Sequence, residues 1–490
     1  MSQIKKLAGQ TLIYGLSNML GRFLNYLLVP LHTIVLGKFF YGKLTYIYSS
    51  TAILLVLLTY GLETGFFRFA SKKEEQYNKV LGTSLYSITF TTILFIILSV
   101  IFRNSWQNYF EIDSLKIVYY FIFIIALDVL NAIPFAKLRI DERPVKFMLI
   151  KLIGIFTNIG LNVFYLVVCR KLYEAGDTGF LASLYKPQYV LDYVLLANLV
   201  SSAVTLLFLM PEIIKVKPDF DFKLLKRLLN YSYPILLIGL AGMLNDNIDK
   251  LMIPKLISAE NPTEQLGIYG ANFKLSVLMV LFIQMFRYAA EPFFFKNAEN
   301  KNAKKLYADV MVYFIIFGLL IFLGVIFYLD ILKYFIAKEF REGLFVVPVL
   351  LIAKLIYGIV FNLSTWYKVT DKTKFGILVA GVGAIITIFI NYFMIPIYGY
   401  KASAYATLVS YSVMMVISYY LGRKYYDIPY NFRKIGFYIL LATGFYFVNR
   451  FLSNQNKIVY YVISNLLLIS FVGIAYIKEK KQIKKEISNF

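Results

Sequence analysis

Charged and polar side chains inside long apolar segments are the residues of this sequence that could do chemistry. Arg22 lies near the middle of the stretch GLSNMLGRFLNYLLVP, residues 15–30, and Tyr14, Asn18 and Asn25 share its helical face. A charge at the centre of a membrane helix costs about 2.5–3.5 kcal/mol, so it faces the protein interior or a wet cavity. Arg22, Asn18 and Asn25 are therefore candidate ligands in a polar cavity.

Two lysines extend this candidate cavity. Lys354 lies near the middle of its apolar segment and Lys274 in the outer third of its own. Cations at these positions suit an anionic cargo, because arginine offers two parallel donors to a phosphate and lysine a point charge. A neutral or cationic cargo would favour carboxylates and aromatic rings, and the sequence also contains intramembrane carboxylates.

The carboxylates are candidates for ion pairs or for coupling to an ion gradient: Glu63, Asp128, Asp246 and Asp249. A structural role is the alternative for several charges. Arg22 and Asp246 could form an ion pair, and four groups nearer the inner ends of their segments could pair or extend to the interface: Glu63, Lys151, Arg287 and Glu291. His32 is expected at the outer interface.

The composition requires a membrane protein. Hydrophobic residues make up 59% of the 490 residues and charged residues 16%, where a soluble chain has about 25%. The apolar excess extends along the whole chain, which predicts a polytopic all-α protein. The net charge of +23 then indicates cytoplasmic loops beside anionic lipid and no nucleic acid partner. One cysteine and one histidine exclude an intramolecular disulfide and a histidine-cluster metal site, so no metal or cofactor is expected.

About fourteen transmembrane helices are expected from the hydropathy pattern. With the N-terminus inside, the predicted inner segments hold 31 Lys and Arg and the outer loops 14, so both termini are predicted to be cytoplasmic. The spans are expected at 11–36, 44–65, 80–102, 117–136, 147–169, 189–211, 231–254, 266–290, 307–329, 344–365, 375–397, 402–421, 435–449 and 458–477.

A repeat divides the chain. Residues 239–254, GLAGMLNDNIDKLMIP, match residues 15–30 at six of sixteen positions, and Arg22 aligns with Asp246. Both copies open an inside-to-outside span, which predicts a parallel repeat of two pseudo-symmetric six-helix lobes. The expected parts are a lobe at 1–211, a cytoplasmic amphipathic linker at 212–230, a lobe at 231–421, and two further helices with a basic tail at 422–490.

Three stretches carry a family resemblance: TYGLETGFFRFAS at 59–71, IYGANFKLSVLMVLFIQMFRYAAEPFFF at 268–295, and IPIYGYKASAYATLVSYSVM at 395–414. Together with the fourteen-span layout, they resemble the Wzx-type oligosaccharide flippases of polysaccharide biosynthesis, within the multidrug/oligosaccharidyl-lipid/polysaccharide (MOP) exporter superfamily. The resemblance implies a V-shaped, MATE-like fold and a cationic central cavity, to which Arg22 would contribute. Asp246 departs from a purely cationic pattern.

The resemblance also implies a function and its partners. The expected activity is non-enzymatic: translocation of polyprenyl-diphosphate-linked oligosaccharides to the outer leaflet of a bacterial cytoplasmic membrane, for lipopolysaccharide, O-antigen or other surface polysaccharide. Membrane lipid and a polysaccharide polymerase or ligase are the expected partners. A P-loop motif is absent, so the energy would come from an ion gradient, the membrane potential or product consumption. The alternatives are a cation-coupled drug exporter, a lipid II flippase, and a membrane glycosyl polymerase or ligase, against which the short outer loops argue.

Overall fold

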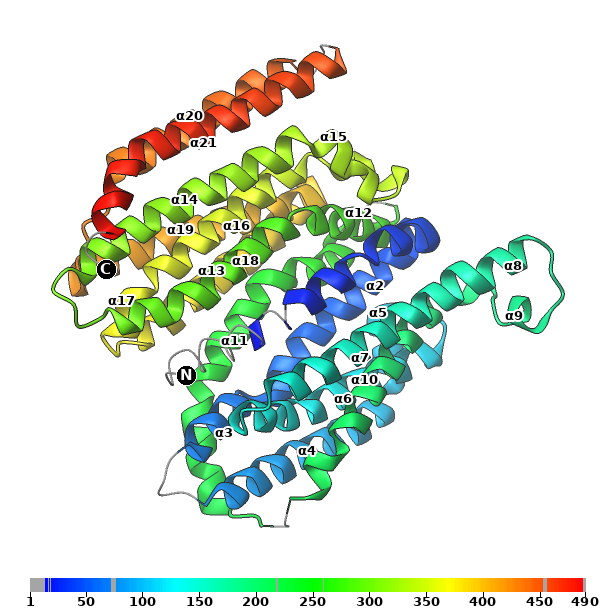
Figure 1. Ribbon diagram of the computed structural model, residues 1–490. Helices are drawn as coiled ribbons and strands as arrows, with labels where there is room; N and C mark the ends of the chain where they lie inside the picture. The colour runs from blue at the N-terminus through cyan, green and yellow to red at the C-terminus, as the bar shows by residue number, and fades with distance from the viewer. Residues whose placement is uncertain are drawn as a thin grey trace. The chain divides into compact units, whose positions relative to one another are not determined.

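The computed structural model of the protein consists of helices and turns, with no strand among the residues that it describes (Figure 1). The description covers residues 14–15, 17, 19–71, 76–216, 219–258, 260–452 and 456–487, the last seven by backbone alone. The predicted all-α class is confirmed. Asn18, one of the candidate cavity residues, lies outside the described residues.

Twelve helices within the described part of the chain are long and apolar enough to cross a membrane, so this is a multi-pass membrane protein. The predicted number of fourteen is not confirmed. The first expected span begins outside the described residues. The thirteenth corresponds to α20 (Phe432–Phe451), which has basic residues near both ends and is not among the twelve.

The first two expected spans meet in α2 (Val29–Thr59), and a glycine separates them. Gly37 has φ 65° and ψ 177°, a conformation that residues with a Cβ rarely adopt. This break lies directly after residue 36, the predicted end of the first span. Upstream, residues 19–26 are helical, residues 27–28 form a turn, and Pro30 lies in the first turn of α2. The first copy of the repeat is thus interrupted, whereas the second is continuous helix.

The chain divides into two compact units. Unit 1 comprises Met1–Ala271 and Ala380–Ser403; unit 2 comprises Asn272–Val379 and Ala404–Phe490. The predicted lobes at 1–211 and 231–421 stay a prediction, and the observed unit 1 includes residues 231–271. The helices that follow α2 in unit 1 are α3 (Leu62–Ala70), α4 (Tyr77–Ile101), α5 (Arg103–Phe110), α6 (Leu115–Ile140), α7 (Pro144–Val163), α8 (Arg170–Glu174), α9 (Phe180–Ser183), α10 (Val190–Ile214) and α11 (Phe222–Leu256).

Helix α6 forms the centre of unit 1. It packs against α2, α3, α4, α7 and α10, and Figure 1 shows it beside α4, α7 and α10. Residues four apart lie on one helical face, and Phe121, Ile125, Val129 and Ile133 are all buried in this way. A π-helical segment, Phe164–Cys169, continues α7 into α8, and a 3-10 turn, Pro187–Tyr189, precedes α10.

The predicted amphipathic linker helix is the beginning of α11. The Asp221 carboxylate caps this helix by accepting hydrogen bonds from the backbone nitrogens of Lys223 and Leu224, at 2.7 and 3.0 Å. It also pairs with Lys79 of α4 at 2.8 Å. Leu224 and Leu228, from the apolar face of the predicted linker, are buried where α11 packs on α3 and α4. That part of the face therefore covers protein.

Small residues let α2 and α12 (Pro262–Leu275) approach closely within unit 1. A Cβ on Gly42 would lie 2.0 Å from the Thr263 carbonyl oxygen, and one on Gly267 would lie 2.1 Å from that of Lys38. Neither contact is possible for a larger residue without movement of the backbone. Such close helix contacts replace the hydrophobic effect as the packing force within a bilayer.

Unit 2 is built around α14 (Ala303–Phe327), which packs against α13, α16, α20 and α21. Helices α20 and α21 lie side by side (Figure 1), where Lys434 and Glu479 pair at 2.8 Å. The remaining helices are α13 (Val277–Lys296), α15 (Leu329–Leu332), α16 (Val346–Leu363), α17 (Thr365–Val369), α18 (Lys374–Tyr398), α19 (Tyr400–Tyr425) and α21 (Lys457–Ile487), with 3-10 turns at Lys333–Phe335 and Lys338–Gly343. Parts of α12, α18 and α19 belong to unit 1.

Candidate functional site

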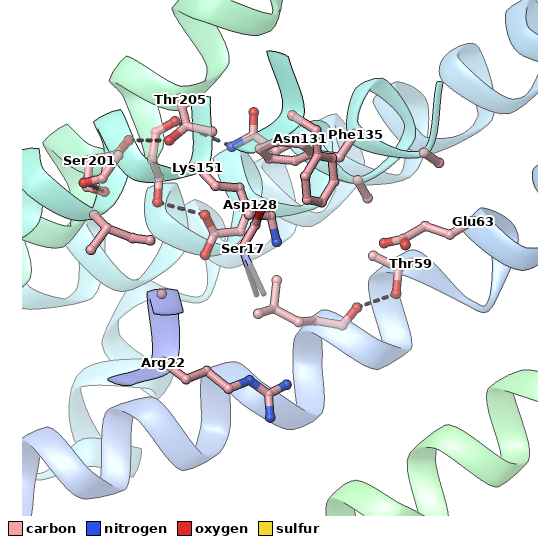
Figure 2. A pocket seen from close by; sticks show the side chains of 18 of the residues that line it. Ser17, Arg22, Thr59, Glu63, Asp128, Asn131, Phe135, Lys151, Ser201 and Thr205 are labelled. Carbon is pink, nitrogen blue, oxygen red and sulfur yellow. Dashed lines mark hydrogen bonds between the residues drawn. The ribbon is translucent and has the colours of Figure 1, made fainter. Parts of the chain in front are cut away.

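Unit 1 contains a pocket of about 700 Å³ with a polar, charged lining. Its walls come from the helical residues before α2 and from α2, α3, α6, α7 and α10, with one residue of α11. Figure 2 shows its polar side chains converging from these separate helices. Five ionisable residues line it: Arg22, Glu63, Asp128, Arg139 and Lys151. Three are basic residues and two are carboxylic acids.

Arg22 and Asn25 occupy the pocket wall formed by the first helical residues, as their shared face predicted. The Asn158 amide of α7 donates to the Asn25 side-chain oxygen at 3.2 Å. The Asn162 amide donates to the Asn158 side-chain oxygen at 3.1 Å. The side-chain oxygen of Asn162 lies 2.8 Å from the His32 Nε2 atom. The His32 ring is buried against α7, and its expected position at the outer interface stays a prediction.

Asp128 lies on α6 and is held by α10. The Ser202 hydroxyl donates a 2.6 Å hydrogen bond to its carboxylate, and the Asn131 amide donates to the Ser202 carbonyl oxygen at 3.4 Å. A carboxylate within a membrane helix needs such a donor or a wet cavity. Asp128 has both, since it also lines the pocket.

Glu63 reaches the pocket because the chain turns sharply before α3. Tyr60 and Gly61 both have left-handed backbone conformations, with φ 35° and 71°. A Cβ on Gly61 would lie 2.8 Å from the Ser232 carbonyl oxygen, so only glycine fits the turn in this conformation. The turn separates α2 from α3 and puts Glu63 in the first turn of α3, facing the pocket.

Lys151 and Arg139 are the charged pocket residues that the sequence analysis does not assign to the cavity. Lys151 was expected at an inner interface, yet its Nζ lies within the pocket, 5.1 Å from the Phe135 ring centre and 5.0 Å from that of Phe147. Arg139 follows the predicted span at 117–136, and its guanidinium lies 5.1 Å from the Phe67 ring centre. All three rings lie close enough to attract these cations. Phe147 lies one helical turn before Lys151 in the sequence, whereas Phe67 is distant from Arg139, so only Lys151 carried a local sequence signal.

Asp249 belongs to a buried ion pair in unit 1. Its carboxylate accepts a 2.6 Å hydrogen bond from the Tyr269 hydroxyl and lies 3.2 Å from the Lys250 Nζ. Lys250 also donates to the Asp246 carbonyl oxygen. Neither Asp246 nor Asp249 is among the residues that line the pocket. The contact with Lys250 does not distinguish the ion-pair role from the coupling role for Asp249. Both roles, like the pairing of Arg22 with Asp246, stay predictions.

Lys274 and Lys354 lie in unit 2, and neither lines the unit 1 pocket. Lys354 is buried on α16, with its Nζ 4.9 Å from the Phe273 ring centre and 5.4 Å from that of Tyr411. Burial among aromatic rings accounts for this mid-membrane charge within the unit's core. Its predicted contact with cargo stays a prediction. Within the described residues, no three His, Cys, Asp or Glu side chains gather to hold a metal.

A family model for polysaccharide biosynthesis proteins matches residues 7–298, which include every residue that lines the pocket. The chain belongs to this family. The sequence resemblance is confirmed at this level. Among curated proteins, none matches significantly.

Solved structures of MOP superfamily transporters share the fold of this polysaccharide biosynthesis protein. The lipid II flippase MurJ in an inward closed conformation superposes with a TM-score of 0.76, at 15% identity, covering 95% of this chain and 99% of MurJ. An inward-facing MATE family multidrug resistance transporter gives 0.59 at 15% identity, over 84% and 94% of the two chains. A further MATE multidrug transporter, DinF-BH, gives 0.57 at 15% identity, over 86% and 96%.

Proposed function

We propose that this protein is a flippase that moves polyprenyl-diphosphate-linked oligosaccharides from the inner to the outer leaflet of a bacterial cytoplasmic membrane. The observation that carries the proposal is the unit 1 pocket, in which Arg22, Arg139 and Lys151 converge inside apolar helices. Grouped arginine and lysine side chains suit a diphosphate, because they bind phosphate oxygens through charge-assisted hydrogen bonds. Membership of a polysaccharide biosynthesis family supports a saccharide cargo.

The neutral part of the pocket suits sugar. Hydroxyl and amide groups of α6 and α10 line the wall around Asp128: Asn131, Asn198, Ser201, Ser202 and Thr205. Sugar hydroxyls both donate and accept hydrogen bonds, so this mixed wall can bind a saccharide while the cations hold the diphosphate. The similar fold of a lipid II flippase is consistent with a lipid-linked saccharide, and lipid II remains the alternative cargo.

An apolar groove in unit 2 suits the lipid chain. It has a volume of about 870 Å³ and is lined by aliphatic and aromatic side chains of α14, α16, α19 and α20. A polyprenyl chain has no polar groups to satisfy, so an apolar groove within a bilayer can hold it.

Two carboxylates in the pocket favour a second candidate function. Glu63 and Asp128 lie among the cations, and a cation-coupled drug exporter uses carboxylates in this way. In the flippase, the same residues would couple transport to an ion gradient. We also propose that both termini are cytoplasmic. A separate polymerase or ligase would use the translocated oligosaccharide, so this protein itself would catalyse no reaction.

Reconstitution of the purified protein into liposomes tests the proposal. Lipid-linked oligosaccharide with a fluorescent label on its sugar is placed in one leaflet of the liposomes. If the protein moves it to the other leaflet, the label should become accessible to a quencher added on that side. Deletion of the encoding gene should also leave the lipid-linked unit on the inner leaflet and abolish surface polysaccharide. Normal surface polysaccharide with lowered drug tolerance would overturn the flippase in favour of the exporter.

A further inference from the structure

A chain of four polar side chains leads from the pocket wall into the interior of unit 1. The Nε2 atom of His32 lies 2.8 Å from the Asn162 side-chain oxygen. The Asn162 amide donates to the Asn158 side-chain oxygen at 3.1 Å, and the Asn158 amide donates to the Asn25 side-chain oxygen at 3.2 Å. We call these four residues the amide chain: His32, Asn162, Asn158 and Asn25. Of its members, Asn25 lines the pocket.

One backbone carbonyl group fixes the direction of the amide chain. The Asn162 amide nitrogen also donates to the Asn158 backbone carbonyl oxygen, at 2.9 Å, and a carbonyl oxygen can only accept a hydrogen bond. The side-chain nitrogen of Asn162 must therefore face Asn158, so its side-chain oxygen faces His32. Because that oxygen also can only accept, His32 carries a proton on Nε2 and donates it.

The same reasoning extends to the pocket wall. The Asn162 nitrogen is a donor, so the Asn158 side-chain atom 3.1 Å away is the oxygen, and the Asn158 nitrogen is directed at Asn25. Asn25 accepts this hydrogen bond with its oxygen, which leaves its amide nitrogen with two N–H groups for a ligand. Asn25 thus offers the pocket a donor whose identity is set by the amide chain.

The amide chain also bridges a break in the first helical segment. Residues 27–28 form a turn, with Asn25 before it and His32 after it, in α2. Asn158 and Asn162 are four residues apart on one face of α7, so this helix holds the chain on both sides of the turn. Asn162 is fully buried, and loss of its partner would leave a buried polar atom unsatisfied. These contacts therefore hold Asn25 in one orientation.

Arg22 lies three residues before Asn25, and both side chains line the pocket. A phosphate group has several acceptor oxygens, so it can bind a guanidinium and a neighbouring amide together. We propose that the Asn25 amide donates a hydrogen bond to a phosphate oxygen of the cargo, and that His32 is a positioning residue that orients this amide through the amide chain. The inference rests on the proposed function, because it takes the diphosphate of that cargo as the acceptor.

NMR spectroscopy tests the amide chain without any cargo. His32 is the only histidine of the protein, so a histidine-selective nitrogen label reports on it alone. The full-length protein in nanodiscs, purified without a histidine tag, should show an Nε2 proton that exchanges slowly with water. Asn162→Leu should speed this exchange roughly tenfold, because the acceptor is lost. The matched control is Asn300→Leu, at an exposed position where the amide donates to Asn297 at 2.7 Å.

Transport in liposomes tests the donor. Asn25→Asp keeps an oxygen for Asn158 and replaces the remaining nitrogen with a second oxygen, so the half-saturating cargo density should rise at least about tenfold, with a smaller change in the maximal rate. Asn300→Asp, which makes the same change at an exposed position, should leave both values unchanged.

Variants of His32 separate positioning from a merely structural role. His32→Phe removes the Nε2 donor and should raise the half-saturating cargo density. His32→Gln, whose side-chain amide can donate in the same place, should return it toward the parental value. A merely structural role would instead lower the amount of folded protein and the maximal rate in both His32 variants, and would leave the half-saturating density unchanged.

The contradicting results differ for the two levels of the proposal. A proton on Nδ1 alone, or equal exchange rates in the parent and Asn162→Leu, would overturn the amide chain. Parental half-saturation in Asn25→Asp would overturn the cargo contact while the proposed function stands. If that variant does not fold, Asn25→Ala takes its place, and parental half-saturation there overturns the contact. Absence of transport by the parent would overturn the proposed function and the cargo contact with it.

Discussion

Ser202 on α10 donates a 2.6 Å hydrogen bond to Asp128 on α6, and both side chains line the same pocket. One polar contact thus joins two pocket walls and fixes the direction of the carboxylate. The sequence alone indicates Asp128 as a candidate site residue, whereas nothing in the sequence distinguishes Ser202.

Ser202→Ala should therefore lower transport by roughly tenfold, because a hydrogen bond to a charged group contributes about 1.5–3 kcal/mol. Transport of labelled cargo in liposomes measures the loss. Ser183→Ala is the matched control, since the Ser183 hydroxyl donates only to the nearby Phe180 carbonyl oxygen at 2.7 Å on an exposed turn. Parental transport by Ser202→Ala would contradict a role for this contact.

Lys151→Met should abolish most transport, since it removes one of the pocket's three cations and keeps the length of the side chain. We expect a loss of at least about tenfold, equivalent to ~1.4 kcal/mol of cargo interaction. Lys151→Arg should retain more activity because the charge remains. Lys171→Met, at an exposed position on α8, should transport normally. Equal activity of both methionine variants would exclude Lys151 from cargo binding.

Gly267→Ala should destabilise unit 1, because the new Cβ would lie 2.1 Å from the Lys38 carbonyl oxygen. Overpacking of this kind costs about 1–3 kcal/mol. Thermal unfolding in detergent should show a lower midpoint for this variant. Gly473→Ala serves as the control, since a Cβ there meets no atom within 4 Å. Matching midpoints for the two variants would show that α2 and α12 can separate without cost.

The ion pair between Asp221 and Lys79 should persist at pH values below the ordinary pKa of an aspartate. The hydrogen bond from Lys79 is the largest cause that lowers the pKa of Asp221, from 3.8 to about 2. A carboxylate whose pKa is lowered on folding contributes stability above its unfolded pKa, and loses it as pH falls through the folded value. Asp221→Asn keeps the helix cap and removes the charge.

The unfolding midpoints of the parent and Asp221→Asn should then differ by a constant amount from pH 8 to about pH 5. The difference should shrink as the pH falls below the unfolded pKa of about 3.9 and vanish as it falls through the folded pKa of about 2. Lys79→Met should reproduce the effect of Asp221→Asn and add nothing to it. A difference that changes between pH 8 and 5 would assign the stability to another group.

The sequence by itself determined that this is a multi-pass helical membrane protein of a polysaccharide biosynthesis family. Long apolar segments can satisfy their backbone groups in a bilayer only as helices, so hydropathy alone predicts the class. It also indicated Arg22, Asn25, Glu63 and Asp128 as interior residues, because uncompensated charges and amides avoid lipid. All four line the pocket.

Only the tertiary structure decided which charges meet. Lys151 and Arg139 line the pocket, and Asp249 pairs with Lys250. Lys354 packs among aromatic rings in unit 2. Helical periodicity predicts which residues share a face, but the neighbour of that face depends on helix packing and rotation. A buried cation can be stabilised by a carboxylate, by aromatic rings or by water in a pocket. The local sequence around the cation is the same in all three cases, so only the packing of the helices distinguishes these environments.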